Sequence, residues 1–499
     1  MLKRILVANR GEIAIRIMRA ARELEIESVA IFHQVDKKSN YLQYSDYSLE
    51  IKGETPKSAF LDIEQIIEKA LEIKADAIHP GYGFLSENAK FAAACEKAGI
   101  KFIGPKSSSI EAMGSKTKAR EIMEAAGVPI VPGTKEPIKN LEIAKQIAQQ
   151  IGYPILLKAS AGGGGKGMRD VRDESEFEDN FAAAQREASK AFGDDSIYIE
   201  KLIENPKHIE IQIIADEFGN CVYLGERDCS IQRRHQKLIE ESPSTVLDPM
   251  TREKMGQVAV AAAKAVNYVN AGTIEFLFDK QRNFYFLEMN TRLQVEHPVT
   301  ELVTRIDLVK EQILVASGQP LSFTQHDIPF CGHAIECRIN AEDVFNGFLP
   351  DTGTITFMQE PHGNGVRVDS GISINSEVTV HFDPMLAKLI TYGKNRTEAI
   401  EKMSRALKNY IIQGVKTNIP FHLLVMKHPK FIEGNYDTSF LEKDFDYNEL
   451  SKISDDNLEM LAAILAFHIS EFENKSFPTK SNSSVNKWKE KQLFPRRII

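Results

Sequence analysis

The first 113 residues alternate short apolar segments with segments of helical periodicity, and this alternation constrains the fold more than any other feature of the chain. Four apolar runs have the length of strands: residues 5–8, 28–32, 75–78 and 101–104. Residues 12–24 and 61–73 instead place apolar side chains at helical spacing. Strands that alternate with helices usually pair in parallel. The sequence therefore predicts an α/β domain with a doubly wound, mostly parallel sheet.

A dinucleotide-binding domain is the main alternative for this pattern. Such a domain carries Gly-x-Gly-x-x-Gly after its first strand, whereas this chain has Ala8-Asn-Arg-Gly-Glu-Ile13 there. The loop at residues 79–88 (HPGYGFLSEN) follows a strand end, which is where ligands bind in open α/β sheets. Its two glycines permit close approach of the backbone to a ligand. We expect either a ligand-binding loop or a tight structural turn.

Residues 272–297 contain two apolar segments that carry carboxylates. Residues 272–278 and 283–287 are predicted strands of a hairpin whose loop would set Glu275 opposite Glu288. Side chains alternate along a strand, so three polar residues can share one surface: Glu288, Asn290 and Arg292. Carboxylate and amide oxygens suit a hard cation such as Mg²⁺. The alternative is a hairpin with solvated glutamates.

Three further segments carry candidate chemistry. Residues 160–168 (SAGGGGKGM) follow a predicted strand that contains Lys158, and their amides form either a lid over phosphates or a flexible hinge. This is not a Walker loop. The basic cluster at residues 233–237 is either an anion site or a solvated face. Alternation in residues 333–342 places Glu336 and Arg338 on the polar face of a strand, where a structural salt bridge is the alternative for Arg338.

Composition excludes several classes of protein. The 499 residues suffice for about three domains, and the net charge of −8 argues against a nucleic-acid surface. No apolar run reaches the about 18 residues of a membrane span, and residues 1–10 resemble neither a signal nor a transit peptide. The five cysteines form no Cys-x-x-Cys pair, which is typical of reduced thiols. We therefore expect a cytoplasmic enzyme.

Five motifs in order resemble biotin carboxylase, the ATP-grasp component of biotin-dependent carboxylases: VANRGEIA, HPGYGFLSEN, GGGGKGM, ERDCSIQRRHQK and EMNTRLQVEHPVTE. The resemblance covers about residues 1–446. It implies a preATP-grasp domain at 1–113, an ATP-grasp domain at 114–330 with a mobile lid at about 131–203, and an α+β biotin carboxylase C-terminal domain at 331–446. Residues 447–499 are then an extension, with an apolar helix expected at 455–472 and a polar end that contains Trp488.

The resemblance also implies the site. The residues matching the family's ATP contacts are Lys116, Lys158, Gly163, Gly164, Gly165, Lys166, Glu200, Lys201, Ile203, His208, Gln232, His235, Glu275 and Glu288. Mg²⁺ or Mn²⁺ would bind Glu275 and Glu288, with Asn290 beside them. Bicarbonate would bind Arg292, Gln294, Lys237 and the Val295 backbone. Glu296 would be the general base, and Arg338 would stabilise the enolate-like oxygen of biotin.

The reaction implied is the conversion of ATP, bicarbonate and biotin to ADP, phosphate and carboxybiotin through carboxyphosphate. No Ala/Val-Met-Lys-Met biotinylation sequence is present, so biotin is expected on a separate carrier protein, with a separate carboxyltransferase. The final acceptor stays open among acetyl-CoA, propionyl-CoA and pyruvate. A homodimer is expected, with Arg19 and Glu23 near its interface. Two alternatives are another ATP-grasp ligase, such as one like carbamoyl-phosphate synthetase, and a non-catalytic nucleotide-sensing protein.

Overall fold

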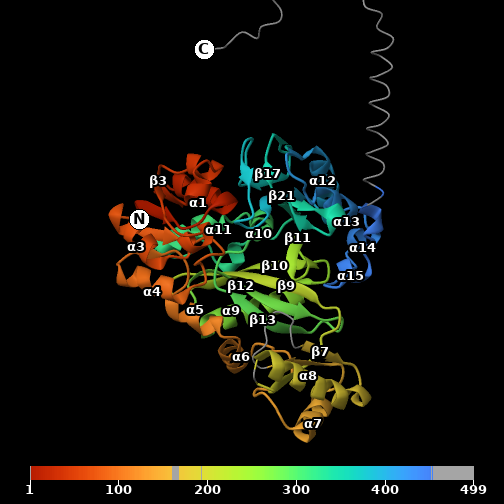
Figure 1. Cartoon of the computed structure of the whole chain (residues 1–499). Helices are drawn as coiled ribbons and strands as arrows, with labels where there is room; N and C mark the ends of the chain where they lie inside the picture. Colours follow the sequence, from red (N-terminus) through yellow and green to blue (C-terminus); the bar gives the residue numbers. More distant parts are fainter. Residues whose placement is uncertain (1, 160–167, 193, 451, 453–499) are drawn as a thin grey trace, which may run out of the picture. The chain divides into compact units, whose positions relative to one another are not determined.

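A computed structural model of the chain describes residues 2–159, 168–192, 194–450 and 452. The described residues up to 446 form one compact unit, shown in Figure 1, and the chain divides into a second unit from Tyr447 on. The glycines of the predicted lid loop, the helix expected at 455–472 and Trp488 lie outside the described residues.

The N-terminal region contains a five-stranded, fully parallel sheet in the order β3-β2-β1-β4-β5, which confirms the predicted doubly wound domain. Its strands are β1 Arg4–Val7, β2 Glu27–Phe32, β3 Tyr47–Glu50, β4 Ala77–His79 and β5 Lys101–Phe102. Its helices are α1 Gly11–Glu23, α2 Pro56–Phe60, α3 Ile63–Glu72, α4 Ala89–Lys97 and α5 Ser107–Gly114. The sequence pattern did not predict β3, because this edge strand has only Leu49 partly buried and so lacks a core-facing apolar alternation.

The central sheet has eight antiparallel strands in the order β13-β12-β9-β10-β11-β14-β21-β19. They are β9 Lys207–Ala215, β10 Cys221–Arg233, β11 Gln236–Ser242, β12 Asn270–Phe278, β13 Phe284–Asn290, β14 His333–Asn340, β19 Val366–Ser370 and β21 Met385–Gly393. β11 pairs with β14, so a single sheet runs through both sides of the domain boundary predicted near residue 330. That boundary stays a prediction.

Helices pack on this sheet. α9 Pro249–Ala265 contacts β9 and β10, α10 His297–Thr304 contacts β10, β11, β14 and β21, and α12 Arg396–Asn409 contacts β14 and β21. Several short elements complete the described C-terminal part: β15 Glu342–Asp343, β16 Leu349–Pro350, β17 Gly353–Thr354, β18 Phe357–Gln359, β20 Glu377–Val378, β22 Ile411–Gln413, α13 Ile419–Val425, α14 Pro429–Glu433 and α15 Phe440–Lys443. Among the described residues, no helix is both long and apolar enough to cross a membrane.

The described part of residues 131–203, where a lid is predicted, has its own small core. Its antiparallel sheet β7-β6-β8 consists of β6 Ile155–Ala159, β7 Met168–Val171 and β8 Ile197–Lys201. α7 Leu141–Ile151 and α8 Phe177–Phe192 accompany it, after α6 Lys116–Ala125. Phe177 and Phe181 stack within this core, with ring centroids 5.6 Å apart. The segment thus has a hydrophobic cluster of its own, and its mobility stays a prediction.

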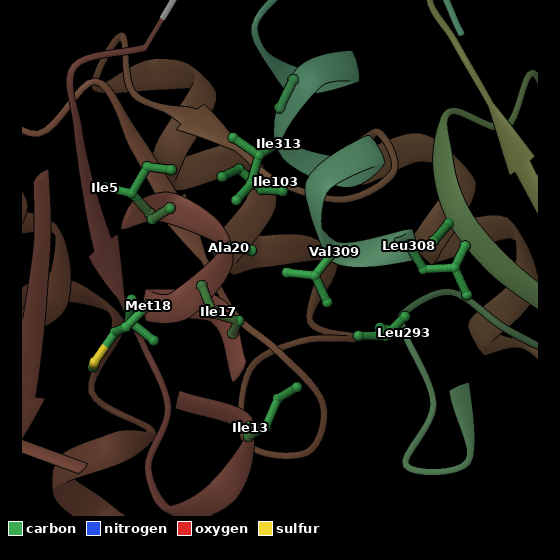
Figure 2. Packing of buried hydrophobic residues seen from close by; sticks show 14 of the residues in the cluster. Ile5, Ile13, Ile17, Met18, Ala20, Ile103, Leu293, Leu308, Val309 and Ile313 are labelled. Carbon is green, nitrogen blue, oxygen red and sulfur yellow. The ribbon is translucent and has the colours of Figure 1, made fainter. Parts of the chain in front are cut away.

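A large core cluster joins the N-terminal region to the segment that follows β13. Figure 2 shows Ile13, Ile17 and Met18 of α1 in one cluster with Leu308, Val309 and Ile313 of α11 Leu308–Ala316. Leu293, directly after β13, is fully buried in the same cluster. This apolar anchor fixes the backbone on which Gln294, Val295 and Glu296 follow.

Three buried histidines make the fold sensitive to acid. Burial lowers the pKa of His79 to about 3 and of His422 to about 4, and it holds the pKa of His297 well below its usual value. The folded protein therefore keeps these rings neutral, whereas the unfolded chain binds protons below its ordinary pKa of about 6.5. Above that pH these histidines do not reduce the free energy of unfolding. As the pH falls below it, the unfolded chain takes up protons that the folded protein does not, and the free energy of unfolding decreases.

We expect each such histidine to steepen the acid loss of unfolding free energy by about 1.4 kcal/mol per pH unit. For His422 the effect should extend from about pH 6.5 down to about pH 4, where its folded form protonates. Urea unfolding across this pH range measures the free energy of unfolding at each pH. For His422→Gln, this free energy should fall less steeply with decreasing pH than it does for the natural protein. Replacement of the exposed His326 by glutamine is the control, and an unchanged slope in His422→Gln would refute the assignment.

Candidate functional site

A chamber of about 1370 Å³ opens where the central sheet meets the N-terminal region. Twelve of the residues singled out from the sequence line it: His208, Gln232, His235, Lys237, Glu275, Glu288, Asn290, Arg292, Gln294, Val295, Glu296 and Arg338. The loop at residues 82–84 also lines the wall, so the HPGYGFLSEN segment borders the chamber. Asn9 fastens this loop by donating to the carbonyls of Pro80 and Tyr82, each at 2.7 Å.

Directly opposed strand residues form a row of charges across the sheet floor. Glu288 on β13 pairs with Glu275 on β12, which confirms the predicted hairpin register. Glu275 pairs in turn with Glu210 on β9, and Glu210 with Arg227 on β10. Cross-strand partners place their side chains on the same face of a sheet. Three carboxylates therefore stand side by side, which requires cations among them.

Lys237 supplies one of these cations. Its ammonium lies 2.6 Å from Glu210, 2.9 Å from Glu275 and 2.7 Å from Glu296. Burial alone would lower the pKa of Lys237, but the three carboxylates outweigh it and raise that pKa well above its usual value. Lys237 is thus a permanent cation, and it joins the strand carboxylates to the segment that precedes α10.

Glu296 connects two cations across the chamber. One of its oxygens accepts from Lys237, and the other accepts from Arg338 at 2.8 Å. Burial by itself would raise the pKa of Glu296, but Lys237 and Arg338 hold it well below its usual value. Arg338 also donates to Glu240 at 2.6 Å, which is the structural salt bridge considered as the alternative. Arg338 lines the chamber as well, so both interpretations of this residue apply. Glu296 is therefore a carboxylate within reach of any substrate held between these cations.

Arg227 connects several polar side chains beneath the chamber. Its guanidinium is fully buried, pairs with Glu210 and donates to four neutral side chains: Gln294 at 2.6 Å, Gln212 at 2.7 Å, Thr300 at 2.9 Å and Thr273 at 3.2 Å. Gln294 also donates to Glu275 at 2.8 Å. A planar guanidinium with five donors suits such a branched network.

Replacing Arg227 by methionine should lower the free energy of unfolding by about 3–5 kcal/mol, because buried polar partners then lose their donor. Urea unfolding measures this loss. Arg172→Met is the matched control, since Arg172 pairs with Glu204 at the surface and such pairs contribute about 0–1 kcal/mol. A loss for Arg227→Met no larger than for this control would refute the role of the network.

Glu288 and Glu275 suit a divalent cation. Among the described residues, the Glu288 side chain forms no hydrogen bond or ion pair, and it faces the chamber. Glu288 is exposed to the chamber, but partial desolvation by its surroundings and the charge of Glu275 raise its pKa. An unpaired carboxylate next to a second one is a favourable donor set for Mg²⁺. Asn290 is less available, since it donates to Glu275 at 2.9 Å and its oxygen accepts from Arg292 at 3.0 Å.

The segment after β13 presents donors for a small anion. Arg292 lies in the chamber wall and is oriented by Glu87, whose carboxylate accepts from Nε at 2.9 Å. The Val295 carbonyl accepts from buried Lys388 at 2.8 Å, and its N–H has no acceptor among the described residues. The Arg292 guanidinium and the Val295 N–H, together with Lys237, could donate hydrogen bonds to a planar oxyanion.

The basic cluster forms a tight hairpin turn between β10 and β11. Arg234 and His235 have φ values of +50° and +64°, as the two central residues of a type I′ turn require. Non-glycine residues at such angles concentrate at functional sites. Both line the chamber together with Gln232 and Lys237, which favours an anion site over a solvated face.

The remaining candidates lie outside the chamber wall: Lys116, Lys158, Glu200, Lys201 and Ile203. Glu200 forms ion pairs with Lys158 and, at 2.8 Å, with Arg120. The Lys201 ammonium donates to the carbonyls of Gly152 and Tyr153 at 2.9 and 2.8 Å. Lys116 begins α6 and acts electrostatically on Glu288. Gly163, Gly164, Gly165 and Lys166 lie outside the described residues.

Comparison with known proteins gives matches along most of the chain. Residues 1–110 match the family described as the N-terminal domain of biotin carboxylase, and residues 336–443 match its C-terminal domain. Residues 115–324 match the ATP-binding domain of the carbamoyl-phosphate synthase L chain.

Individual relatives are similar over most of their length. A pyruvate carboxylase subunit of Methanothermobacter thermautotrophicus is 54% identical over 443 residues, which are 89% of this chain and 90% of the relative. Biotin carboxylase 1 of Bacillus subtilis is 53% identical over 89% of this chain and 98% of its own. Among solved structures, the biotin carboxylase domain dimer of the Hydrogenobacter thermophilus 2-oxoglutarate carboxylase, in complex with MgADP, ADP and bicarbonate, has a TM-score of 0.81 at 50% identity, covering 89% of this chain and 98% of its own.

Proposed function

The chain belongs to the biotin carboxylase family, and we propose that Lys237, Glu296 and Arg338 carry out the two chemical steps in its chamber. The enzyme is an ATP-grasp ligase that uses ATP and bicarbonate to carboxylate biotin. One observation supports the assignment above all others: the single carboxylate of Glu296 contacts both Lys237 and Arg338.

In the first step, Glu296 accepts the bicarbonate proton, and the freed oxygen attacks the γ-phosphorus of ATP while ADP leaves. Arg292, Gln294 and the Val295 N–H orient the bicarbonate for this attack. Lys237 and Arg338 keep Glu296 ionised. Once the γ-phosphate of ATP interacts with Lys237, this ammonium stabilises the Glu296 carboxylate less, and the basicity of Glu296 rises during the first step.

In the second step, carboxyphosphate breaks into CO₂ and phosphate, and this phosphate removes the N1 proton of biotin. N1 then attacks CO₂. Negative charge develops on the ureido oxygen of biotin, and Arg338 stabilises it. Arg338 suits this role because Glu240 holds its Nε end, while its other end reaches Glu296 at the chamber.

Glu275 and Glu288 would hold Mg²⁺, or Mn²⁺ in its place, with Asn290 beside them. When bound, the ion would neutralise negative charge on the phosphates of ATP. For the nucleotide, we propose His208, Gln232 and His235 around ribose and phosphates, and Glu200, Lys201 and Ile203 at the adenine. Lys116, Lys158 and the loop of Gly163, Gly164, Gly165 and Lys166 would contact phosphates.

The alternative of another ATP-grasp ligase rests on the central segment, which matches a carbamoyl-phosphate synthase domain. Both flanking matches are to biotin carboxylase instead, and Arg338 lies in the second of them. A non-catalytic nucleotide sensor would not need the paired contacts of Glu296. We therefore favour the enzyme over both alternatives.

The partners we propose follow from the reaction. Biotin would arrive on a carrier protein, and a carboxyltransferase would pass the carboxyl group to an acyl-CoA or 2-oxo acid. Relatives include subunits of pyruvate and 2-oxoglutarate carboxylases and a propionyl-CoA carboxylase chain, so the acceptor stays open. A dimeric relative supports a homodimer, for which Arg19 and Glu23 are proposed to lie near the interface on α1. The cytoplasmic location stays a prediction; all five cysteines, which lie within the described residues, are unpaired.

ADP release from the purified protein tests the function. With Mg²⁺, ATP and bicarbonate, free biotin should stimulate ADP formation, because it consumes the carboxyl group and drives turnover. Omission of bicarbonate is the control and should remove the stimulation. Carbamate or ammonia stimulation in place of biotin stimulation would instead favour a carbamoyl-phosphate synthetase-like ligase.

A further inference from the structure

Two fully buried carboxyl groups face each other behind Arg338. Glu240 on β11 is directly opposite Glu336 on β14, and both have zero solvent exposure. Side chains of such pairs have Cβ atoms about 5 Å apart. Glu336 also lies across from Ile390 of β21, which belongs to an apolar cluster with Val299 of α10. The surroundings of Glu336 are therefore apolar except for a few charged neighbours.

Three of the four carboxyl oxygens in this pair have no hydrogen-bond partner. Both oxygens of Glu336 and one oxygen of Glu240 are buried and unpaired, while the other Glu240 oxygen accepts from Arg338. An unpaired buried anion is costly, and native proteins avoid it. One proton on the pair would supply the missing donor, since a carboxylic acid can donate to a carboxylate.

The charged groups that face the pair leave no cation for Glu336 among the described residues. Arg338 of β14 is already shared by Glu240 and Glu296. Lys388 of β21 contacts the Val295 carbonyl and lies 3.3 Å from Glu12 and 3.8 Å from Asp369. Lys237 of β11 is held by its three carboxylates. Two further titratable neighbours act on the pair: the carboxylate of Glu296, directly before α10, and the buried thiol of Cys337 on β14.

We propose that Glu336 is a neutral carboxylic acid that donates its proton to Glu240, so that one negative charge rather than two lies behind Arg338. Glu336 is then a positioning residue that acts through Glu240 and Arg338. Burial raises the pKa of Glu336 well above its usual value, and burial raises the pKa of Glu240 to about 7, which agrees with a shared proton. This inference rests on the proposed function of Arg338.

The charge balance gives the proton a role in the second step. If Glu336 is neutral, the charges of Arg338 and Glu240 sum to zero. Glu296 carries no charge once it has accepted the bicarbonate proton. The guanidinium can therefore still attract a developing oxyanion. Loss of the Glu336 proton would add a buried negative charge and oppose that oxyanion. The stabilising effect of Arg338 on biotin should therefore disappear as the pair ionises, whereas bicarbonate-dependent ATP cleavage without biotin should not follow it.

Infrared spectroscopy and pH profiles on the full chain test the proposal together. At pH 7.5, the difference spectrum between the natural protein and Glu336→Gln should contain the C=O stretch of a protonated carboxyl group. The biotin-dependent rate, divided by the biotin-independent rate, should fall by about tenfold per pH unit only where this band is lost. Glu336→Gln and Glu336→Leu cannot ionise, and their ratio should lack this fall.

Glu311→Gln is the matched control, since Glu311 is a second buried carboxyl with an unpaired oxygen and a raised pKa, located on α11. It should keep the natural profile. Absence of the band at pH 7.5, or the same alkaline fall in the natural protein and in the Glu336 variants, would overturn the proposal. If the variants do not fold, difference spectra of the natural protein between pH 7.5 and higher pH must still show the loss of this band over the same pH range as the fall in the rate ratio. No biotin-dependent activity at any pH would instead overturn the proposed function.

Discussion

Replacing Glu296 by glutamine is expected to slow bicarbonate-dependent ATP cleavage by about 10²–10⁴-fold, the usual contribution of a general base. Glutamine fills the same space but cannot accept the bicarbonate proton. In this variant Lys237 would retain its ion pairs with Glu210 and Glu275, and Arg338 would retain its ion pair with Glu240. We therefore expect the fold to persist. Single-turnover ADP formation measures the loss, and equilibrium titration should show ATP binding close to that of the natural protein.

Glu311→Gln serves again as the control, because it replaces a buried carboxyl group on α11 while sparing the chamber. Its ATP cleavage should stay near the natural rate. ATP cleavage by Glu296→Gln at the natural rate would exclude Glu296 as the base and would turn attention to another chamber group. Loss of ATP binding together with cleavage would assign Glu296 to the architecture of the site.

Replacing Arg338 by glutamine should reduce biotin carboxylation by about 10²–10³-fold, the cost of removing one donor to a developing oxyanion. Bicarbonate-dependent ATP cleavage without biotin should fall much less, because Lys237 still holds Glu296. The two rates, measured on the same preparation, give a ratio that a general loss of folded protein cannot change. That ratio separates a role in the second step from a structural role.

Arg396 offers a matched control for this experiment. It pairs with Glu241, the neighbour of Glu240 on β11, through two hydrogen bonds at 2.7 and 3.1 Å. Arg396 does not line the chamber. Arg396→Gln should therefore lower stability while leaving the ratio of the two rates unchanged. Equal losses of both rates in Arg338→Gln would place Arg338 in a shared step or in folding.

Much of the fold was predictable because its signals are local. The apolar strands and helices of the N-terminal domain alternate within short windows, and the register of Glu275 with Glu288 follows from two strands joined by a short loop. The pairing of β11 with β14 was not predictable from pattern, since a long stretch of chain separates Glu240 from Glu336 and no turn links their strands.

The candidate site shows the same division. Residues within recognisable motifs, such as Lys237 and Glu296, were singled out and lie together in the chamber. Their supports were not singled out: Glu210, Glu240 and Lys388 lie outside the motifs, and Arg227 and Glu87 lie within motifs but were given no role. A partial signal existed, because polar residues at alternate positions of an apolar strand, such as His208, Glu210 and Gln212, indicate one polar face. The charged partners of such a polar face cannot be read from the pattern, because they come from strands and helices distant in the sequence.

Oxygen transfer from bicarbonate to phosphate tests the central claim most directly. The natural protein would cleave ATP in unlabelled water with ¹⁸O-labelled bicarbonate and biotin, and the phosphate released early would be analysed by mass spectrometry. If the ionised bicarbonate attacks the γ-phosphorus after Glu296 removes its proton, each phosphate carries one labelled oxygen. Phosphate whose new oxygen comes from water would contradict the account, because ATP would then be hydrolysed without passing through carboxyphosphate.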